Sequence, residues 1–235
     1  MTQLLKDIRK ALESRVDTKY KIGAARYSKE PVKMLGVRAA DVRALAKDYY
    51  PQVKGLPKGE FFETCESLIK QGHFEEIAIA FDWTWRRRKQ LDITDFDRLE
   101  TWIERFVSNW GSCDDLCCHA IGYMLEQYPE LIDRPLRWAK SPNRWFRRAA
   151  AVSLIYPARR EVLVDEAFQV ADILISDEDD LVRKGYGWLL KEISRKNPRR
   201  VFDYVVLNVS RMPRVAFRYA IEKLPKEMRK KAMEA

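Results

Sequence analysis

Glycine, proline, cysteine and histidine are scarce in this 235-residue sequence, with 9, 10, 4 and 2 residues respectively. So little glycine and proline argues against long disordered linkers. The longest apolar runs are far too short to span a bilayer, and the first residues have the pattern of an amphipathic helix rather than of a signal peptide. With 46% hydrophobic and 34% charged residues, we expect a globular cytoplasmic protein.

The few cysteines and histidines are a poor basis for a metal site or for histidine catalysis. Cys113, Cys117 and Cys118 cluster with His119, but their spacing fits no zinc-binding pattern. Small apolar thiols are common in protein cores. We therefore expect structural roles for these residues, and neither a metal nor a cofactor.

Negative charge is in deficit. The chain has 44 lysines and arginines against 35 aspartates and glutamates, a net charge of +9, and a pI near 9.3. This excess favours nucleic acid or another anionic surface as the partner. By itself it leaves other partners open, because many proteins are basic.

Helical spacing of apolar residues dominates the sequence. Residues 75–83 and 162–170 carry apolar side chains at intervals of three and four, as helices do. Residues 201–207 come closest to a strand pattern, but the preceding Asn197-Pro198 favours a short helix. Ser176, followed by acidic residues, is expected to cap a helix N-terminus. The sequence predicts an all-α fold.

A weak internal repeat adds to this prediction. Small residues followed by large apolar ones recur at intervals of about 30 to 36 residues, as HEAT-like repeats do. We predict a curved α-solenoid of HEAT-like helical repeats, forming a single domain over residues 1–235, with its concave face as the binding surface. A monomer is expected, since such a solenoid needs no second copy. The recurring segments start at Ala120, Ala149, Gly185 and Ala220.

Charged pairs stand near the start of the second helix of successive repeats, where stacking would line them along the groove. These pairs are Asp114-Asp115, Arg147-Arg148 and Arg183-Lys184. Basic side chains there would contact phosphates, with help from backbone N–H groups at helix N-termini. Further basic clusters occupy 86–89 and 211–214. A solvated charged surface is the alternative interpretation of each cluster.

Asp114 is unusual because a carboxylate in a positive groove repels phosphate. It could pair with Arg148 for a structural purpose. It could instead stabilise positive charge that develops during a reaction, as at the anomeric carbon when a glycosidic bond breaks. Trp110 and Trp188 could supply π-electron density to the same cation. Core packing is the alternative for each, in a chain with seven tryptophans.

Together these residues resemble the AlkD-like DNA alkylation repair family of HEAT-like DNA glycosylases. The resemblance covers nearly the whole chain and ends in a closing basic helix. The motifs that carry it, in chain order, are Ala25-Arg26-Tyr27, Leu35-Gly36-Val37, Asp41-Val42-Arg43, Trp110-x-Ser112-x-Asp114, Trp145-x-x-Arg148-Ala149-Ala150, Gly187-Trp188-Leu189-Leu190-Lys191-Glu192 and Asn197-Pro198.

The resemblance implies a nucleoid-associated enzyme that excises cationic N-alkylated purines, such as 7-methylguanine and 3-methyladenine, from double-stranded DNA. By resemblance, Asp114 stabilises the oxocarbenium-like sugar and positions a water, while Trp110 and Trp188 cradle the lesion nucleotide. No particular lysine stands out as a Schiff-base nucleophile, so a monofunctional mechanism is expected. The predicted DNA-binding residues are Arg148, Tyr27, Arg147, Lys184, Arg183, Arg43 and Arg214.

Two positions depart from the family pattern. The family often has an aromatic residue where this chain has Asn109, and an acidic residue where it has Gly111. These changes bear on substrate preference and rate rather than on the reaction class. The alternatives to a glycosylase are a non-catalytic HEAT-like protein that binds distorted or branched DNA, and a HEAT-type protein scaffold indifferent to DNA.

Overall fold

Helices make up all the regular structure in the computed structural model of the chain, which describes residues 3–26 and 31–235. No strand occurs in that part of the chain, so the all-α prediction is confirmed. The strand-like residues 201–207 lie in helix α14 (Pro198–Leu207), with Pro198 at its first position. None of the described helices is long and apolar enough to cross a membrane.

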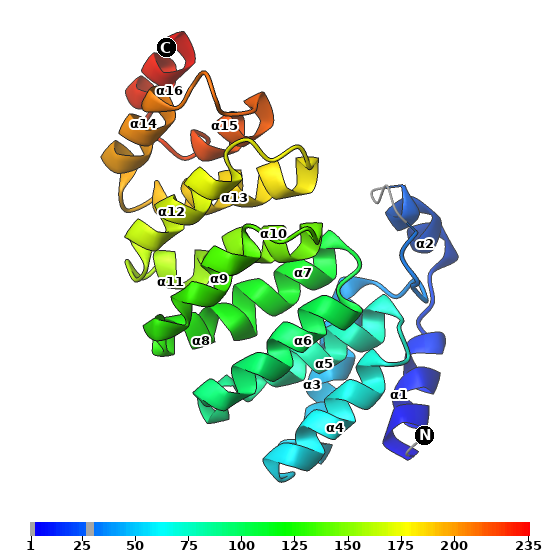
Figure 1. The fold of residues 1–235 in the computed structure, drawn as a ribbon. Coiled ribbons are helices and arrows are strands. Elements are labelled where there is room, and N and C mark those ends of the chain that lie inside the picture. Colours follow the sequence, from blue (N-terminus) through cyan, green and yellow to red (C-terminus); the bar gives the residue numbers. More distant parts are fainter. Residues whose placement is uncertain (1–2, 27–30) are drawn as a thin grey trace. The chain divides into compact units, whose positions relative to one another are not determined.

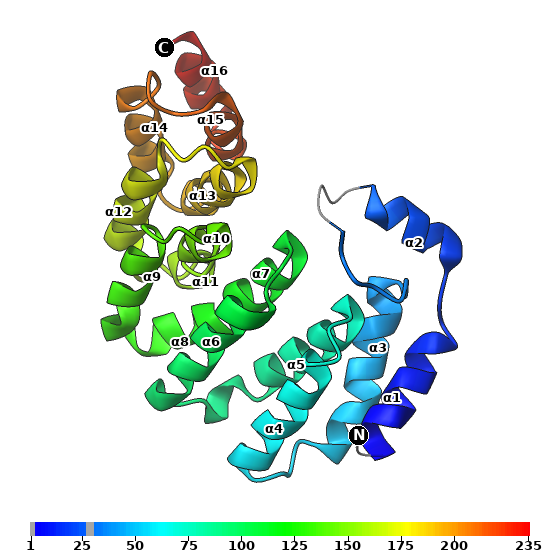
Figure 2. The ribbon, with the colours of Figure 1, turned by 45° about the vertical axis from the view of Figure 1, so that its right-hand side comes forward.

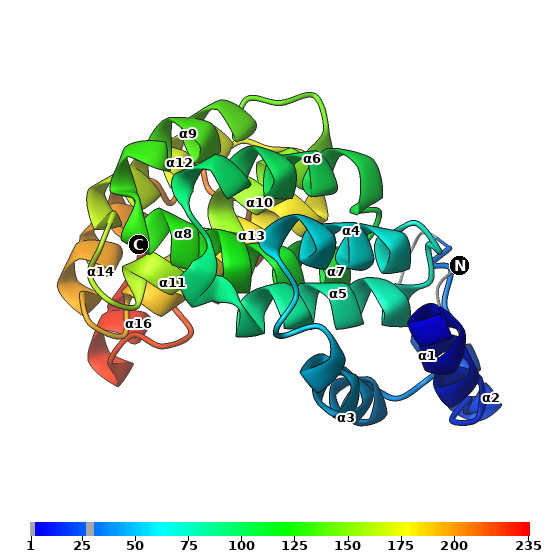
Figure 3. The ribbon, with the colours of Figure 1, turned by 90° about the horizontal axis from the view of Figure 1, so that it is seen from below.

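Unit 1 is the first of two compact units and comprises Met1–Leu91 with Arg105–Asp115. α4 and α3 both pack against α5, and Figure 3 shows α4 and α5 side by side. Its helices, of which the last continues one residue into the second unit, are α1 (Gln3–Glu13), α2 (Thr18–Ala25), α3 (Ala39–Tyr49), η1 (Tyr50–Gln52), α4 (Lys58–Ile69), α5 (Phe74–Arg86), η2 (Arg88–Gln90) and α7 (Trp110–Leu116).

A fully buried carboxylate fixes the segment before α3. Glu75, in the first turn of α5, accepts hydrogen bonds from the backbone N–H groups of Leu35, Gly36 and Val37 at 2.9, 2.7 and 3.0 Å. Three such bonds offset the cost of burying the charge. Gly36 has φ +104°, a conformation that favours glycine. The Leu35-Gly36-Val37 motif is therefore a backbone strap held on α5.

Unit 2 comprises Asp92–Glu104 and Leu116–Ala235. It stacks helix pairs in two rows, α9, α12 and α14 in one and α10, α13 and α15 in the other (Figures 1 and 2). This is the solenoid-like packing of HEAT-like repeats, as predicted. Its elements are η3 (Ile93–Asp95), α6 (Phe96–Phe106), the π-helix η4 (Cys117–Ile121), α8 (Gly122–Gln127), η5 (Pro129–Ile132), α9 (Asp133–Trp138), α10 (Arg144–Val152), α11 (Ile155–Ala158), α12 (Val164–Leu174), α13 (Asp180–Ile193), α14 (Pro198–Leu207), α15 (Arg214–Ala220) and α16 (Lys226–Glu234).

Small residues allow the helices of unit 2 to approach closely, as the repeat predicts. A Cβ on Gly187 of α13 would lie 2.8 Å from the carbonyl oxygen of Ala216 in α15. A Cβ on Gly122 of α8 would lie 2.6 Å from the Cβ of Tyr156 in α11. Both distances are shorter than real Cβ contacts, so only glycine fits at these two crossings.

The prediction that Ser176 caps a helix is wrong. The N-cap of α13 is Asp179, whose Oδ1 accepts hydrogen bonds from Leu181 N at 2.8 Å and Val182 N at 3.3 Å. Asp179 stands directly before the first turn in an extended conformation, which an N-cap requires. Ser176 lies three residues too early to reach the unpaired N–H groups of that turn.

Candidate active site and nucleic-acid interface

In unit 1, two residues of the predicted reaction centre, Trp110 and Asp114, lie on α7, whose start is fixed by Asn109. This buried side chain accepts a hydrogen bond from Ser112 N through Oδ1 at 2.9 Å and donates one to Ser112 Oγ through Nδ2 at 3.1 Å. An asparagine in this position satisfies an otherwise unpaired N–H group of the first turn. The polar residue that departs from the family pattern is therefore a helix cap that places Trp110 first in α7.

Gly111 is explained by close packing beneath α7. A Cβ at this position would lie 3.1 Å from Cε2 of Phe74 and 3.2 Å from Oδ1 of Asn109. The acidic side chain found at this position in the family pattern would have to displace the Phe74 ring or disturb the cap. In this chain Gly111 thus belongs to the packing that seats the start of α7 on α5.

Trp110 and Asp114 are one helical turn apart on α7, so their side chains lie on the same face. Trp110 is 45% exposed, whereas Asp114 and its neighbour Asp115 are half-buried. The core-packing alternative is therefore wrong for Trp110. Ser112 and Cys113 are buried on the other side of the helix. Unit 1 thus presents an exposed indole and a half-buried carboxylate together.

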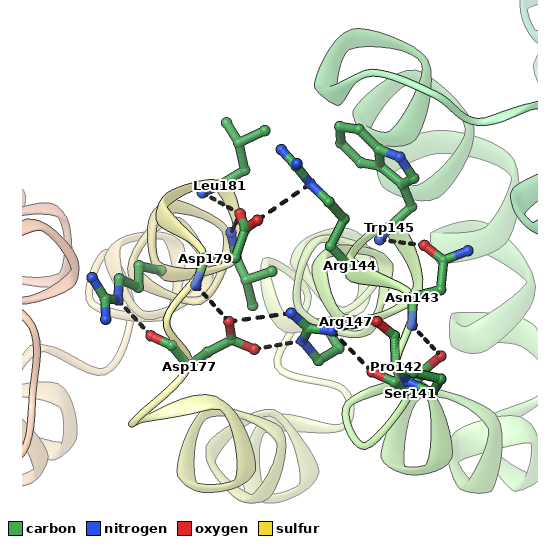
Figure 4. A network of polar contacts seen from close by, with 11 residues as sticks. Ser141, Pro142, Asn143, Arg144, Trp145, Arg147, Asp177, Asp179 and Leu181 are labelled. Atoms are coloured by element: carbon green, nitrogen blue, oxygen red, sulfur yellow. Dashed lines mark hydrogen bonds and ion pairs between the residues drawn. The ribbon is translucent and has the colours of Figure 1, made fainter. Parts of the chain in front are cut away.

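In unit 2, Arg147 joins the loop before α10 to the loop before α13 (Figure 4). Its Nε forms an ion pair with Asp177 at 2.6 Å, and its Nη1 donates hydrogen bonds to the carbonyl oxygens of Ser141 and Pro142, both at 3.0 Å. Arg183 donates to the backbone carbonyl of the same Asp177. Two of the predicted phosphate contacts thus meet at one acidic loop residue.

Arg148 is buried, with 6% of its surface exposed. Its Nη1 donates a hydrogen bond to the carbonyl oxygen of Leu181 in the first turn of α13. Its Cγ lies 3.5 Å from the position that a Cβ on Gly185 would occupy, so the small residue leaves room for the arginine stem. The guanidinium is held at the N-terminal end of α13.

Trp188 is half-buried on α13 and anchored one turn further along by Glu192. Its Nε1–H donates to Glu192 Oε1 at 3.2 Å, while Arg159 Nε and Arg195 Nε lie 3.0 and 2.9 Å from Oε2. Burial alone would raise the pKa of Glu192. The hydrogen bond and charge of Arg159, the charge of Arg195 and the bond from Trp188 outweigh burial, so that this pKa is below its ordinary value.

The remaining predicted DNA-binding residues are distributed over both units. Lys184, half-buried on α13, pairs with Asp180 at 2.7 Å. Arg43 on α3 of unit 1 is exposed, and so is Arg214 at the start of α15. Tyr27 lies outside the described residues. Within residues 3–26 and 31–235, no group of three or more His, Cys, Asp or Glu residues is arranged to hold a metal ion.

Comparison with known families decides the relationship of the chain. The family model described as DNA alkylation repair enzyme matches residues 8–224. The chain belongs to the DNA alkylation repair enzyme family. Membership in this family supports a role in the repair of alkylated DNA, and the family's name indicates that this role is enzymatic. The resemblance found in the sequence is thereby confirmed.

Two solved structures share the fold of this family member. One, named "Predicted DNA alkylation repair enzyme from Enterococcus faecalis", has a TM-score of 0.79 at 17% identity, over 90% of this chain and 98% of the other. The other is smu.31 from Streptococcus mutans UA159, with a TM-score of 0.57 at 20% identity, over 78% of this chain and 98% of the other. No curated protein matches the chain.

Several residues that shape the site of this DNA alkylation repair family member were missed in the sequence. Asn109 was noted only as a departure from the family pattern, although asparagine is among the residues preferred at an N-cap. Glu192 appeared within a motif but without a role. Nothing local in the sequence shows that the side chain of Asp177 binds Arg147, because that arginine lies thirty residues earlier, on another helix.

Proposed function

We propose that this family member is a monofunctional DNA glycosylase that excises cationic N-alkylated purines, such as 7-methylguanine and 3-methyladenine, from double-stranded DNA. The observation that carries the proposal is the pairing on α7. There Trp110 is 45% exposed and lies one turn before the half-buried Asp114. Large exposed aromatic side chains are enriched at recognition surfaces, and a nearby carboxylate suits a reaction in which positive charge develops.

The proposed reaction needs few protein groups. An alkylated purine with a positive charge is a good leaving group, so the C1′–N bond breaks with its electron pair going to the base, which leaves neutral. The cation that forms at C1′ is stabilised by the carboxylate of Asp114 and by the π face of Trp110. Water then adds to C1′ and loses a proton, giving the abasic sugar. No general acid is required for departure of the base.

Unit 2 contributes DNA contacts in this proposal. Trp188, anchored by Glu192, is the second aromatic surface for the lesion nucleotide. In this proposal Arg148 contacts a backbone phosphate near the lesion. Backbone contacts of this kind set the register of the protein on DNA without reading its sequence.

The remaining cations fall into two groups. Arg43 and Arg214 are exposed and can meet phosphates directly. Arg147, Arg183 and Lys184 each have an acidic residue or its backbone as partner. We propose that these three raise the positive potential around Arg148. Where one of them contacts a phosphate, that contact replaces its contact with the acidic residue.

The test is base release from duplex DNA containing a single 7-methylguanine, with Asp114→Asn and Asp115→Asn as a matched pair. Both carboxylates are half-buried and adjacent on α7, so each variant removes one negative charge from nearly the same place. We expect release by wild type and Asp115→Asn, and loss of release with DNA binding retained in Asp114→Asn. Salt-dependent binding without release by wild type would instead identify a binder of distorted DNA.

A further inference from the structure

We propose that the end of unit 2 carries a second DNA-binding surface, which contacts the phosphate backbone of duplex DNA away from the lesion. This inference rests on the proposed function only in taking duplex DNA as the partner. We name it the C-terminal basic face, and it consists of Arg214 and Arg218 on α15 with Lys226, Arg229 and Lys230 on α16.

Positive charge is concentrated at this end of the chain. Residues 211–235 contain eight lysines and arginines against three glutamates, a side-chain charge of +5 out of the +9 of the whole chain. All five members of the C-terminal basic face are exposed. Such a concentration raises the local potential and attracts polyanions.

The members of the face lie on common sides of their helices. Lys226, Arg229 and Lys230 precede Met233 by seven, four and three residues, which places all three on its side of α16. Met233 Sδ lies 3.9 Å from Nη2 of Arg214, so this side of α16 adjoins α15. Arg218 follows Arg214 by one turn. The contact between Arg214 and Met233 joins the cations of α15 to those of α16, and we take the five together as one surface.

The side of α16 next to the face carries charges of both signs. Lys231 follows Glu227 by four residues and precedes Glu234 by three, spacings at which opposite charges on a helix attract. Ala232, between the two sides, is the buried contact of α16 with the rest of unit 2. Lys230 has similar spacings to the same two glutamates, but within the described residues neither glutamate forms an ion pair with it, so its charge remains available to a partner.

Three exposed cations elsewhere in unit 2 have acidic partners. Lys196, Arg199 and Arg200, at the junction of α13 and α14, each lie within 3.4 Å of a carboxylate oxygen. In the described part of the chain, no carboxylate lies within ion-pair distance of any member of the C-terminal basic face. A cluster of like charges costs stability through mutual repulsion, and a polyanion would relieve that cost.

The chemistry of the face fits a phosphate backbone better than a lipid surface. Helices that bind membranes bury a broad apolar side in the headgroup region, whereas the large apolar side chain exposed on α16 is Met233, at 45%. Each strand of duplex DNA carries one phosphate charge per about 3.4 Å of its axis, so several cations on one side of a helix can each meet a phosphate. α16 also lies beyond residues 8–224, which the family model matches.

The test compares two triple variants with the same change in charge. Lys226→Gln, Arg229→Gln and Lys230→Gln together remove part of the face. Lys196→Gln, Arg199→Gln and Arg200→Gln remove three exposed cations that have acidic partners. Affinity for an undamaged duplex of about two helical turns, roughly 20 base pairs, is measured over a range of salt concentrations for wild type and both variants.

We expect the first triple variant to lower the slope of log affinity against log salt by about two to three, because each phosphate contact contributes about 0.9. Its affinity near physiological salt should fall on the order of ten- to a hundredfold, while the second triple variant changes the slope by less than about one. A third triple variant, Lys226→Arg, Arg229→Lys and Lys230→Arg, keeps the charges and should keep the slope, which separates charge from misfolding.

Equal slopes for the first two variants would overturn the inference, and so would a loss of binding to anionic vesicles with no change in DNA affinity. The outcome is independent of catalysis because the duplex is undamaged. If wild type releases the base but the first two triple variants have equal slopes, the proposed glycosylase activity is retained and the proposed second DNA-binding surface is rejected. If the first triple variant has a reduced slope but wild type releases no base, the second DNA-binding surface is retained and the glycosylase activity is rejected.

Discussion

At the scale of single residues, the two departures from the family pattern are both accounted for by packing at the start of α7. Asn109 caps the helix, and Gly111 makes room for the ring of Phe74. They act together, since a Cβ on Gly111 would also approach the cap oxygen of Asn109. The exposed position of Trp110 follows from this local arrangement.

Replacing Asn109 tests that arrangement. Asn109→Ala removes the cap and should destabilise the protein by about 0.5–2 kcal/mol, measured by denaturant unfolding. Asn109→Asp keeps an oxygen that can accept from Ser112 N, and its charge suits a helix N-terminus. It should therefore retain most of the stability. Equal losses in the two variants would show that the cap is not what the residue contributes.

Glu192 gives unit 2 a pH-dependent anchor for Trp188. Its pKa is below the ordinary value of 4.5 because the two arginines and the indole outweigh burial. A carboxyl with a lowered pKa in the folded state contributes stability above its ordinary pKa and loses that contribution as the pH falls through the lowered value. The expected window is thus acidic, at and below about pH 4.5.

The prediction is that wild type is more stable than Glu192→Gln near neutral pH and that this difference shrinks on acidification. Thermal unfolding of the two proteins from about pH 7 to about pH 3 measures it. Arg159 and Arg195 are half exposed, so the variant leaves them hydrated and folding intact. A difference that stays constant over this range would contradict the role of the carboxylate charge.

At the scale of elements, α13 is the central helix of unit 2, with α10 on one side and α15 on the other. Its two glycines face these neighbours differently. A Cβ on Gly187 would lie 2.8 Å from the backbone oxygen of Ala216, whereas a Cβ on Gly185 would lie 3.5 Å from Arg148 Cγ, an ordinary contact. Replacing each glycine by alanine therefore distinguishes the cost of close packing, which applies at Gly187, from the low helix propensity of glycine, which applies at both positions.

Gly187→Ala should destabilise the protein by about 1–3 kcal/mol, because α13 and α15 must move apart. Gly185→Ala should be neutral or stabilise it by up to about 1 kcal/mol, since alanine favours a helix and no backbone atom is displaced. Denaturant unfolding of both variants gives the comparison. An equal loss of stability in the two variants would contradict the view that close packing against α15 explains Gly187.

The elements themselves could be predicted from the sequence because helix formation depends on local spacing. The strand-like residues 201–207 were placed in a helix from Asn197-Pro198 alone. The repeat predicted where small residues allow close crossings, as Gly187 and Gly122 do. The π-helix Cys117–Ile121 was not foreseen, because buried residues through this segment recur at the intervals of three and four that an α-helix also shows.

The loops that join the elements could not be predicted in the same way. Ser176 has the chemistry of an N-cap, but the helix starts after Asp179 instead. Asp177 is fixed by Arg147 from another repeat, a partner some thirty residues away. Which acidic residue caps and which one binds an arginine depends on such distant partners. For the candidate site, the functional side chains could therefore be predicted from the sequence. The residues that hold those side chains in place could be identified only in the structure.

At the scale of the whole molecule, the net charge of +9 is unevenly distributed. Many of the described arginines pair with carboxylates, as Arg199 and Arg200 do, so their charge is offset locally. The family relationship covers residues 8–224. The charge of the C-terminal basic face extends past that range, so we expect general DNA affinity and lesion chemistry to be separable in this chain.

The most direct test of the central claim is the single-turnover rate of 7-methylguanine release by Asp114→Asn beside that of Asp115→Asn. We predict that the first variant is slower than wild type by at least about two orders of magnitude, the effect of removing a preorganised electrostatic group. The second should stay within about tenfold of wild type. Similar rates for the two variants would contradict the account, because Asp114 would then not be the carboxylate that stabilises the sugar cation.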